Sequence, residues 1–363
     1  MYSHFDFSQK PLVVIWETTR ACDLACFHCR ASAQPQCHPR ELNTEEAMKL
    51  IRDVAQLKPP IFVMTGGDPL KRKDVYELVK YAAGWGLRPA LTPSATPLLT
   101  RAAIQQLKEA GLSRLAISLD GPRAEVHDTF RGVPGSFART LDAIRWANEL
   151  GVPVQINTTI SKRNLGQLDE MADLLRHQKI VLWSLFCLVP TGRGQLSDLP
   201  TGEEFEEAFA RLYRLSQDLP FRVKTTEGPH YRRYMLQQQH GSNGRDFQFT
   251  ERESAQPWVN DGKGFVFVSH IGDVCPSGFF PVSAGNVKRT PLWWLYRYAP
   301  LFQALRDTSR LKGKCKVCEF KEVCGGSRAR ALAVSGDAFA EEPCCVYQPA
   351  ALRPAQVEIS TTA

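Results

Sequence analysis

Three cysteines lie within eight residues near the start of the chain, at Cys22, Cys26 and Cys29, directly after the apolar run from Leu12 to Trp16. Their spacing is C-x3-C-x2-C. A structural zinc site usually takes four ligands, whereas three thiolates can hold a 4Fe–4S cluster with one iron left open. An open iron is a place where a small molecule can bind and be reduced. The motif therefore predicts redox chemistry at an iron–sulfur cluster.

A second group of cysteines lies near the other end, with Cys315, Cys318 and Cys324 in C-x2-C-x5-C spacing and Cys344 and Cys345 about twenty residues later. In a reducing compartment such groups suggest metal or iron–sulfur ligation more than disulfides. The odd total of 11 cysteines also argues against a closed disulfide framework. The remaining cysteines are Cys37, Cys187 and Cys275.

Other chemistry-bearing residues follow expected strands. Gly66-Gly67-Asp68 comes after an apolar run, and paired glycines let a backbone approach a ligand closely, although the same residues also suit a plain turn. Ser118 and Asp120 alternate onto one face at the end of another strand. Each of these side chains is expected to face a ligand or, in the alternative, only to bond a loop. Ser94 and Asn157 stand in comparable places.

The elements that position these residues are short apolar runs separated by amphipathic helices. Asn43 and Glu46 can cap one such helix, and another runs from Ser136 to Gly151. Repeated strand–helix units imply a parallel sheet with right-handed crossovers, and chemistry collects at the carboxyl ends of its strands. Six units are too few for a closed eight-stranded barrel, so we expect an α/β fold with a partial (β/α)6, TIM-like barrel. The expected strands are Leu12–Glu17, Ile61–Thr65, Arg88–Thr92, Arg114–Leu119, Val154–Thr159 and Val181–Val189.

The composition limits which binding partners and which cellular location we expect for the protein. The 363 residues are 43% hydrophobic and 23% charged, an ordinary soluble profile. A net charge of +7 is too mild to indicate nucleic acid, and no apolar run reaches the length of a membrane helix. The segment from Met1 to Lys10 has no apolar signal core. We expect a cytoplasmic protein with no nucleic-acid partner and no membrane span.

The chain divides into four expected parts. Residues 1–223 form the barrel with a short N-terminal extension, and residues 224–264 form a linker or active-site insertion that is polar and basic from Lys224 to Arg252. Residues 265–350 form a small cysteine-rich domain, which begins with the β-rich piece Phe265–Ser269 and includes an aromatic, helix-like run from Leu292 to Leu305. Residues 351–363 are a polar tail.

The first cysteine motif, together with Gly66-Gly67-Asp68-Pro69, resembles the radical S-adenosylmethionine (SAM) superfamily, whose core is a six-strand partial barrel. The resemblance implies that the three cysteines hold the 4Fe–4S cluster and that SAM chelates its open iron. Gly66, Gly67 and Asp68 would meet the amino group of SAM. Ser118 and Asp120 match a Ser-Leu-Asp-Gly segment near the ribose, and Arg131 matches a residue that meets the carboxylate. The resemblance thus implies two cofactors, SAM and the cluster.

The second cysteine group resembles the SPASM extension, which binds an auxiliary 4Fe–4S cluster. A zinc site would fit the ligand count too. Arg328 stands in the region where the full pattern has a further cysteine, so one auxiliary cluster is expected. Its expected ligands are Cys315, Cys318, Cys324 and Cys345, with Cys344 as the alternative to Cys345. Cys37 and Cys187 are read as ordinary thiols, and Cys275 has no assigned role.

The resemblance implies reductive cleavage of SAM to a 5′-deoxyadenosyl radical, with flavodoxin or ferredoxin as the reductant. Cys29-Arg30-Ala31 resembles the alternative heme-biosynthesis branch, which suggests modification or decarboxylation of a tetrapyrrole side chain. The alternatives are oxidation or cross-linking of a ribosomal precursor peptide, and an iron–sulfur electron-transfer protein. Only about eleven residues precede the first strand, so no fused leader-peptide domain is expected. Four basic residues either hold substrate carboxylates or belong to a solvated loop. They are Lys224, His230, Arg232 and Arg233.

Overall fold

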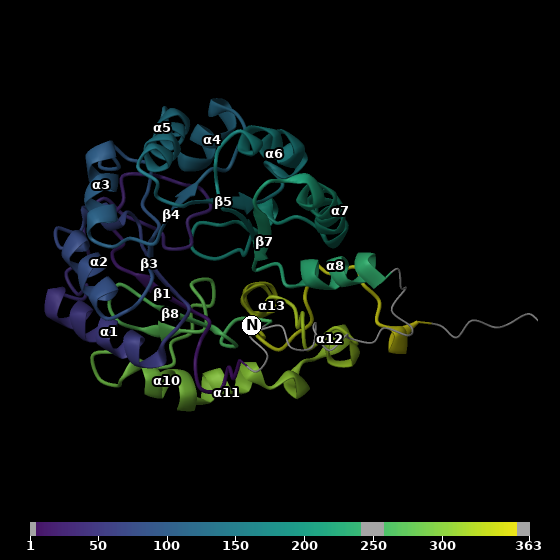
Figure 1. The fold of residues 1–363 in the computed structure, drawn as a ribbon. Helices are drawn as coiled ribbons and strands as arrows, with labels where there is room; N and C mark the ends of the chain where they lie inside the picture. Colours follow the sequence, from purple (N-terminus) through teal and green to yellow (C-terminus); the bar gives the residue numbers. More distant parts are fainter. Residues whose placement is uncertain (1–4, 241–257, 354–363) are drawn as a thin grey trace, which may run out of the picture.

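Eight parallel strands form a curled sheet at the centre of the computed structural model, which describes residues 5–240 and 258–353. The strand order is β7-β6-β5-β4-β3-β2-β1-β8-β9, and only β9 is antiparallel to its neighbour. The helices cover the outside of the curl (Figure 1). The strands are β1 Val13–Glu17, β2 Ile61–Thr65, β3 Pro89–Leu91, β4 Arg114–Ser118, β5 Val154–Ile160, β6 Leu182–Cys187, β7 Arg222–Thr226, β8 Phe265–Val268 and β9 Val274–Cys275.

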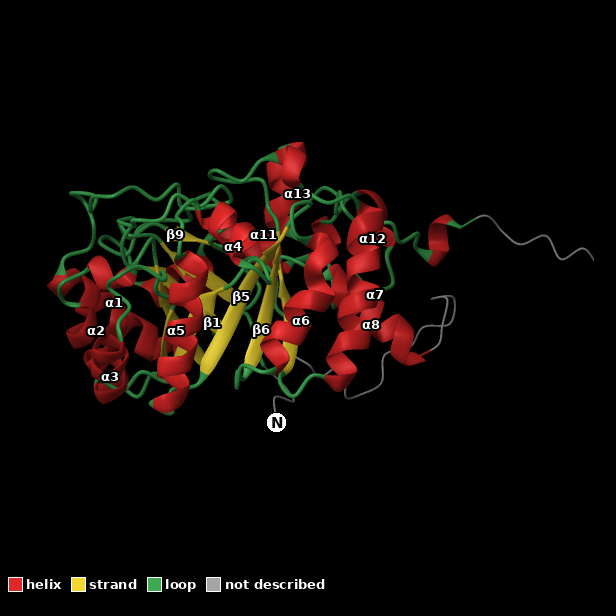
Figure 2. Ribbon diagram, turned by 90° about the horizontal axis from the view of Figure 1, so that it is seen from above, coloured by secondary structure: helices red, strands yellow, loops and turns green. Residues whose placement is uncertain are grey.

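The six expected strands correspond to β1 to β6, and the expected open, TIM-like half-barrel is confirmed. Two further strands extend the sheet: β7 pairs with β6, and β8 pairs with the other side of β1. Strands β1 to β8 are parallel, so their carboxyl ends lie along one edge, where the connecting loops gather (upper side of Figure 2). The sheet stays open, because its two edge strands, β7 and β9, are not paired with each other among the described residues.

Helices alternate with the strands through the first part of the chain. The expected cap is present in the first helix, where Asn43 accepts from the backbone N–H of Glu46 and Glu46 accepts from that of Asn43. The helix that starts at Ser136 ends at Glu149, shortly before Gly151 in the left-handed region at φ +68°. The outer helices are α1 Thr44–Leu57, α2 Val75–Gly84, α3 Arg101–Glu109, α4 Ala124–Arg131, α5 Ser136–Glu149, α6 Leu168–Arg176 and α7 Gly202–Asp218.

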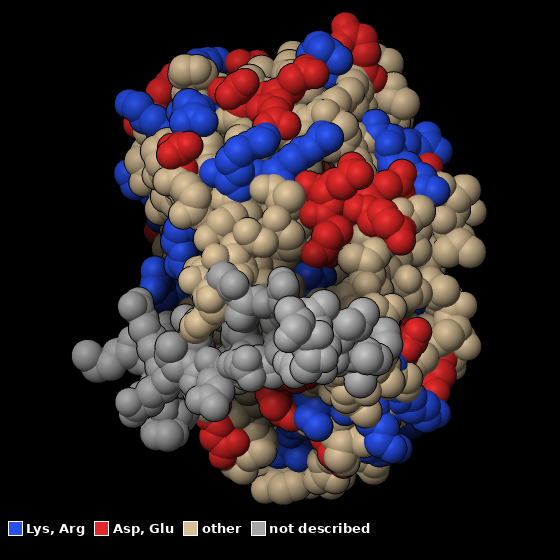
Figure 3. Space-filling view, turned by 90° about the vertical axis from the view of Figure 1, so that its right-hand side faces the viewer, with Lys and Arg blue, Asp and Glu red and all other residues tan. Residues whose placement is uncertain are grey.

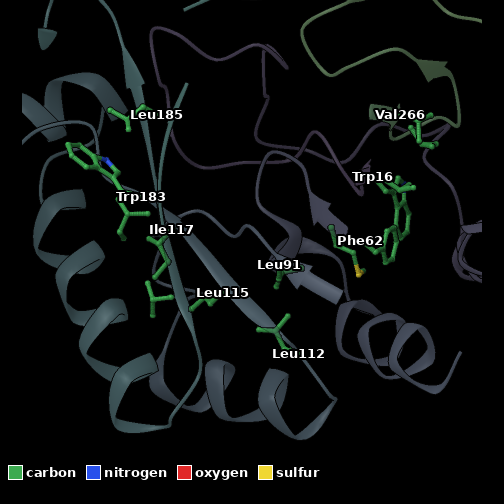
Figure 4. Close-up of a cluster of buried hydrophobic side chains, with 14 of the residues drawn as sticks. Trp16, Phe62, Leu91, Leu112, Leu115, Ile117, Trp183, Leu185 and Val266 are labelled. Atoms are coloured by element: carbon green, nitrogen blue, oxygen red, sulfur yellow. The ribbon is translucent and has the colours of Figure 1, made fainter. Parts of the chain in front are cut away.

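The main core lies between the sheet and this helical layer. Alternate strand residues such as Trp16, Phe62, Ile117 and Trp183 point outward and pack with helix residues, as Figure 4 shows. The other face of each strand lines the inside of the curl, which we call the lumen. Polar residues at lumen positions therefore face a ligand space and not the helices. None of the described helices is long and apolar enough to cross a membrane.

The polar tract after residue 224 is more regular than expected. Its first residues complete β7, and α8 follows at His230–His240. The sequence hid β7 because its lumen-facing residues are polar, so no apolar run marks it. The rest of the tract, up to residue 257, lies outside the described residues. The helix-like run from Leu292 is two helices, α10 Leu292–Tyr298 and α11 Pro300–Arg306, and the proline begins the second.

The cysteine-rich end fills the open side of the barrel, where α13 lies near the centre of the view and α12 beside α8 (Figure 1). Its helices are short: α12 spans Gly313–Val317 and α13 spans Arg328–Ser335. The N-terminal segment is bound to the same region, because the hydroxyl of Tyr296 donates to the carbonyl of Phe7 at 2.8 Å. The two expected iron–sulfur regions thus belong to one packed body.

Candidate functional site

The first cysteine motif lies in the loop between β1 and α1, at the carboxyl edge of the sheet. The backbone N–H of Cys22 donates to Gln34 O at 2.8 Å, and that of Cys29 to Cys26 O at 3.4 Å. From the loop after β6, Arg193 donates through Nε to Cys26 O at 2.8 Å and through its backbone N–H to Cys29 O at 3.0 Å. The protein thus holds the loop through its backbone, and all three thiols remain free of disulfides.

The surroundings of these thiols suit a thiolate-bound group. Burial raises the pKa of Cys22 and of Cys26, so a thiolate there needs a compensating charge. Arg131 supplies one, with Nη1 3.7 Å from Cys26 Sγ, and Ser94 Oγ lies 3.3 Å from Cys22 Sγ. A bound metal cluster would supply the rest. Three sulfur donors, of which Cys22 and Cys26 are buried, lie beside a cation and fit a 4Fe–4S cluster.

The Gly66-Gly67 turn after β2 packs against the start of the cysteine loop. A Cβ on Gly66 would lie 2.5 Å from Thr19 O, and one on Gly67 would lie 2.4 Å from Ala21 O. The N–H groups of Gly67 and Asp68 donate to those same two carbonyls at 2.8 and 2.7 Å. Only glycine allows this approach. Because the two N–H groups are already bonded, a ligand ammonium at this turn would meet carbonyl oxygens.

Asp68 connects the turns after β2 and β3. It is fully buried, and its carboxylate accepts from the backbone N–H of Leu70 at 3.1 Å and from Thr96 Oγ1 at 2.7 Å. Burial raises its pKa. Ser94, in the loop after β3, donates through Oγ to Gly67 O at 2.9 Å while it contacts Cys22. The structure therefore brings Asp68 and Ser94 together beside the first cysteine.

A buried ion pair brings Asp120 and Arg131 to the second cysteine. Arg131 ends α4 and pairs with Asp120, which follows β4 and also accepts from the backbone N–H of Thr159 at 2.8 Å. Burial disfavours the charged carboxylate, but Arg131, together with His28, His127 and the Thr159 backbone N–H, keeps the pKa of Asp120 below its usual value. Ser118 and Asn157 lie opposite each other in the β4–β5 register on the lumen side. Six of the eight predicted cofactor residues thus lie at or just after the ends of β2, β3 and β4. Arg131 reaches this edge from the end of α4, and Asn157 lies in the middle of β5.

The Asp120–Arg131 pair gives a first testable prediction. Replacing Arg131 with Gln leaves a buried carboxylate unpaired and should lower the free energy of unfolding by about 3–5 kcal/mol. The double variant Asp120→Asn/Arg131→Gln should lose clearly less than the sum of the two single variants. Chemical denaturation under anaerobic conditions measures all three. Strictly additive losses would contradict the coupling.

A matched control is available on the surface. Arg123 pairs with Glu170 at 2.8 Å, and both side chains are exposed. Arg123→Gln should change the stability by less than about 1 kcal/mol.

Sequence reasoning missed a second buried charge network at the end of β1. Glu17 is fully buried and accepts from Arg30 Nη1 at 3.1 Å, while His270 Nδ1 lies 2.9 Å from its other oxygen. Burial opposes ionisation of Glu17, but Arg30 and His270 lower its pKa to about 2. Arg30 also stacks over the ring of Phe267 at 4.5 Å. The sequence feature that could have indicated this network is a glutamate, Glu17, at the end of an apolar strand.

The second cysteine group surrounds one hollow of about 370 Å³ in the C-terminal region. Backbone N–H groups point at two of its sulfurs, from Glu342 to Cys315 and from Gly326 to Cys324, both at 3.4 Å. Arg233 and Lys314 line the same hollow and supply positive charge. Burial raises the pKa of each thiol, so thiolates form there only with a bound cation. The four cysteines are Cys315, Cys318, Cys324 and Cys345.

These donors do not form a single-ion site. Among residues 5–240 and 258–353, no three His, Cys, Asp or Glu side chains converge closely enough to hold one metal ion. A single zinc would need its four ligands in one tight tetrahedron. The donor set and its hollow therefore fit a larger thiolate-bound group, such as a 4Fe–4S cluster.

Adjacent Cys344 and Cys345 differ in orientation. Cys345 lines the hollow, whereas Cys344 is buried with its sulfur 3.4 Å from Pro200 O. The remaining cysteines lie elsewhere: Cys187 ends β6, Cys275 belongs to β9, and Cys37 is exposed. Arg328, in the region of the missing further cysteine, is buried and donates to Ala338 O and Ala340 O.

A strained residue joins the barrel to the C-terminal region. Glu227 follows β7 with a φ of +53°, and its carboxyl contacts Ser277 at 3.3 Å and Ser327 at 2.5 Å. Burial, and then Asp261, raise the pKa of Glu227 well above its usual value. Arg330 binds the carbonyl of Glu227 at 2.9 Å. Positive φ in a non-glycine residue is costly and often marks functional regions.

Comparison with known proteins adds independent information. Residues 16–175 match the family model described as Radical SAM superfamily. The chain is 41% identical over 344 residues to a protein of Methanosarcina barkeri (strain Fusaro / DSM 804) named AdoMet-dependent heme synthase, covering 94% of this chain and 98% of that one. It is 33% identical over 360 residues to the Fe-coproporphyrin III synthase of the same organism, covering 94% of this chain and 89% of that one.

Among solved structures, the fold is similar to that of Streptococcus suis SuiB bound to precursor peptide SuiA. The TM-score is 0.74 at 17% sequence identity, and the match covers 93% of this chain and 76% of SuiB. At this identity the likeness concerns the fold alone.

Proposed function

Because the chain belongs to the radical SAM superfamily, and is therefore an enzyme that uses a 4Fe–4S cluster and SAM, we propose that it converts propionate side chains of an iron tetrapyrrole to vinyl groups. In such a reaction each –CH2–CH2–COO⁻ group loses one hydrogen atom, CO2 and one electron and becomes –CH=CH2. The observation that supports this proposal is the 41% identity, over nearly the full length of both chains, to a protein named heme synthase.

The residues proposed to hold the cofactors are those gathered at the carboxyl edge. When bound, the cluster and SAM supply a 5′-deoxyadenosyl radical that abstracts hydrogen from the substrate. Cys22, Cys26 and Cys29 would ligate this cluster. The turn at Gly66 and the side chain of Arg131 would orient the two ends of the SAM amino-acid group. The other proposed contacts are Gly67, Asp68, Ser94, Ser118, Asp120 and Asn157.

Apolar side chains would help to exclude water from the reacting region. Phe186, one residue before the end of β6, faces the lumen, and its ring centroid lies 6.1 Å from that of Phe279. The positive charge of Arg131 is neutralised by Asp120, so it needs no water shell. An auxiliary 4Fe–4S cluster would be held by Cys315, Cys318, Cys324 and Cys345. This cluster would accept the electron that each decarboxylation releases.

Peptide maturation is the second candidate. It is favoured by 28% identity over 351 residues to a protein of Rhodopseudomonas palustris named PqqA peptide cyclase. The identity to the heme-synthase relative is higher, at 41%, so the tetrapyrrole is the better-supported substrate.

The proposal predicts a defined product. Reconstituted enzyme, incubated anaerobically with SAM, dithionite and iron coproporphyrin III, should release 5′-deoxyadenosine and convert the porphyrin to species that lack one carboxyl group and one hydrogen per reacted side chain. Mass spectrometry measures both. Formation of 5′-deoxyadenosine with an unchanged porphyrin, alone or after addition of SAM in excess, would contradict the tetrapyrrole proposal while leaving the enzyme class intact.

A further inference from the structure

A polar row crosses the lumen at a single level of the sheet. The strand register places Ser118 on β4 opposite Asn157 on β5, Asn157 opposite Ser184 on β6, and Ser184 opposite Lys224 on β7. These side chains face the lumen, because the residues that alternate with them pack toward the helices. The row begins at Ser118, a proposed cofactor contact, and ends at Lys224.

The lysine stands in a group of cations. Arg222 precedes it by two positions on the same face of β7, and Arg114 begins β4. Desolvation, and then Arg114, Arg222 and Arg232, lower the pKa of Lys224 to about 8. No described carboxylate forms an ion pair with Lys224, although its side chain remains exposed to the lumen. A cation among other cations is stabilised when an anion binds beside it.

The outer surface is arranged differently. There, basic and acidic side chains are interspersed, as Figure 3 shows for one face. Arg214, for example, pairs with Asp169 at 3.0 Å. The unpaired charge of Lys224 is therefore not the general pattern of this molecule.

The other three residues of the predicted basic tract are already engaged. His230 lies between the rings of Phe205 and Phe209, at 5.5 and 4.7 Å between centroids. Arg233 pairs with Glu206 at 2.5 Å. Arg232 donates to two backbone carbonyls, those of Val259 and Val323. Of the four residues of the predicted basic tract, Lys224 alone presents an unpaired charge to the lumen.

We propose that Lys224, supported by Arg222 and Arg114, is a binding subsite for a carboxylate of the substrate other than the one that reacts. The inference rests on the proposed tetrapyrrole function. Lys224 lies three strands from Ser118, roughly 14 Å along the sheet at the usual strand spacing. An anion held there lies on edge strand β7, six strands along the sheet from β1 and its cysteine loop, as a propionate remote from the reacting carbon would. Arg114 is connected to the row through Gln155, which it contacts at 3.3 Å and which donates to Asn157 at 2.7 Å.

The test is an equilibrium titration of iron coproporphyrin III, followed by Soret absorbance, without SAM or reductant so that binding is separated from turnover. Lys224→Gln should weaken binding roughly 10- to 100-fold, the range expected for one charged hydrogen bond. Lys224→Arg should bind within a few-fold of the natural enzyme. The control Lys80→Gln, which removes an exposed lysine on α2, should bind normally. Lys224→Met serves if the Gln variant does not fold.

The outcomes separate the two proposals. If the natural enzyme binds and converts the porphyrin while Lys224→Gln and Lys224→Met bind it as tightly, the subsite is overturned and the proposed function stands. If the natural enzyme neither binds nor converts the porphyrin, both fail. Weakened binding in Lys224→Gln that Lys224→Arg restores supports the subsite.

Discussion

Replacing Cys22, Cys26 or Cys29 with Ala is expected to reduce 5′-deoxyadenosine formation to the background of the uncatalysed reaction. Each cysteine would supply one of only three protein ligands to the cluster that binds SAM, so the loss of one thiolate leaves two open irons. Iron content should fall from about eight to about four per chain, because the auxiliary cluster would remain. Anaerobic reconstitution, iron analysis and chromatography of the nucleoside measure the effect.

Cys37 provides the matched control for this prediction. It lies in the same loop between β1 and α1, after the motif, and is exposed, with its sulfur 3.8 Å from Thr19 Oγ1. Cys37→Ala should retain iron and activity. Full 5′-deoxyadenosine formation by Cys26→Ala would refute the ligand assignment.

Replacing Cys315, Cys318, Cys324 or Cys345 with Ala should have a different signature. Iron content should again halve, but cleavage of SAM by dithionite-reduced enzyme should persist, because the first cluster is built from another part of the chain. Conversion of the porphyrin should stop, since the electron released with CO2 has lost its proposed acceptor. Comparing the nucleoside yield with the product yield separates the two steps.

The adjacent cysteines give this second prediction an internal control. Cys345 lines the hollow and Cys344 is turned toward Pro200, so Cys345→Ala should lose the auxiliary cluster and Cys344→Ala should keep it. Loss of iron in Cys344→Ala with retention in Cys345→Ala would reverse the assignment. Unchanged iron in both would exclude the auxiliary site.

Sequence patterns were sufficient for the first six strands because each carries an apolar face against the helices, as Ile117 and Trp183 do. They were insufficient for β7, whose exposed Arg222 and Lys224 read as loop. The β-rich piece at Phe265–Ser269 was predicted and is β8, but its pairing with β1 was hidden, because pairing between distant segments leaves no local pattern. Along each strand, residues that face the lumen alternate with residues that face the helices, and the sequence does not distinguish the two sets. Only the register between strands shows which polar residues lie beside one another.

The candidate site was predictable to a similar degree. Cysteine spacing identified both groups, but no local signal distinguishes Cys344 from Cys345, since only tertiary packing orients them. The Gly66-Gly67 turn was read as a close approach to a ligand, and its immediate cause is the approach of Thr19 and Ala21. Glu17 and Arg30 were missed because their buried network is completed in three dimensions, where the end of β1 meets Arg30 from the next loop and His270 from the C-terminal region.

The position of β1 has a consequence for how the protein is made. β1 hydrogen-bonds to β2 on one side and to β8 on the other, where Val13 lies beside Phe265. On the ribosome, this strand keeps an unpaired edge until most of the chain has been synthesised. Contacts between such distant segments form slowly, and an unpaired edge favours aggregation. The cysteine loop that follows β1 therefore reaches its final surroundings only late in folding, which places cluster insertion after translation is nearly complete.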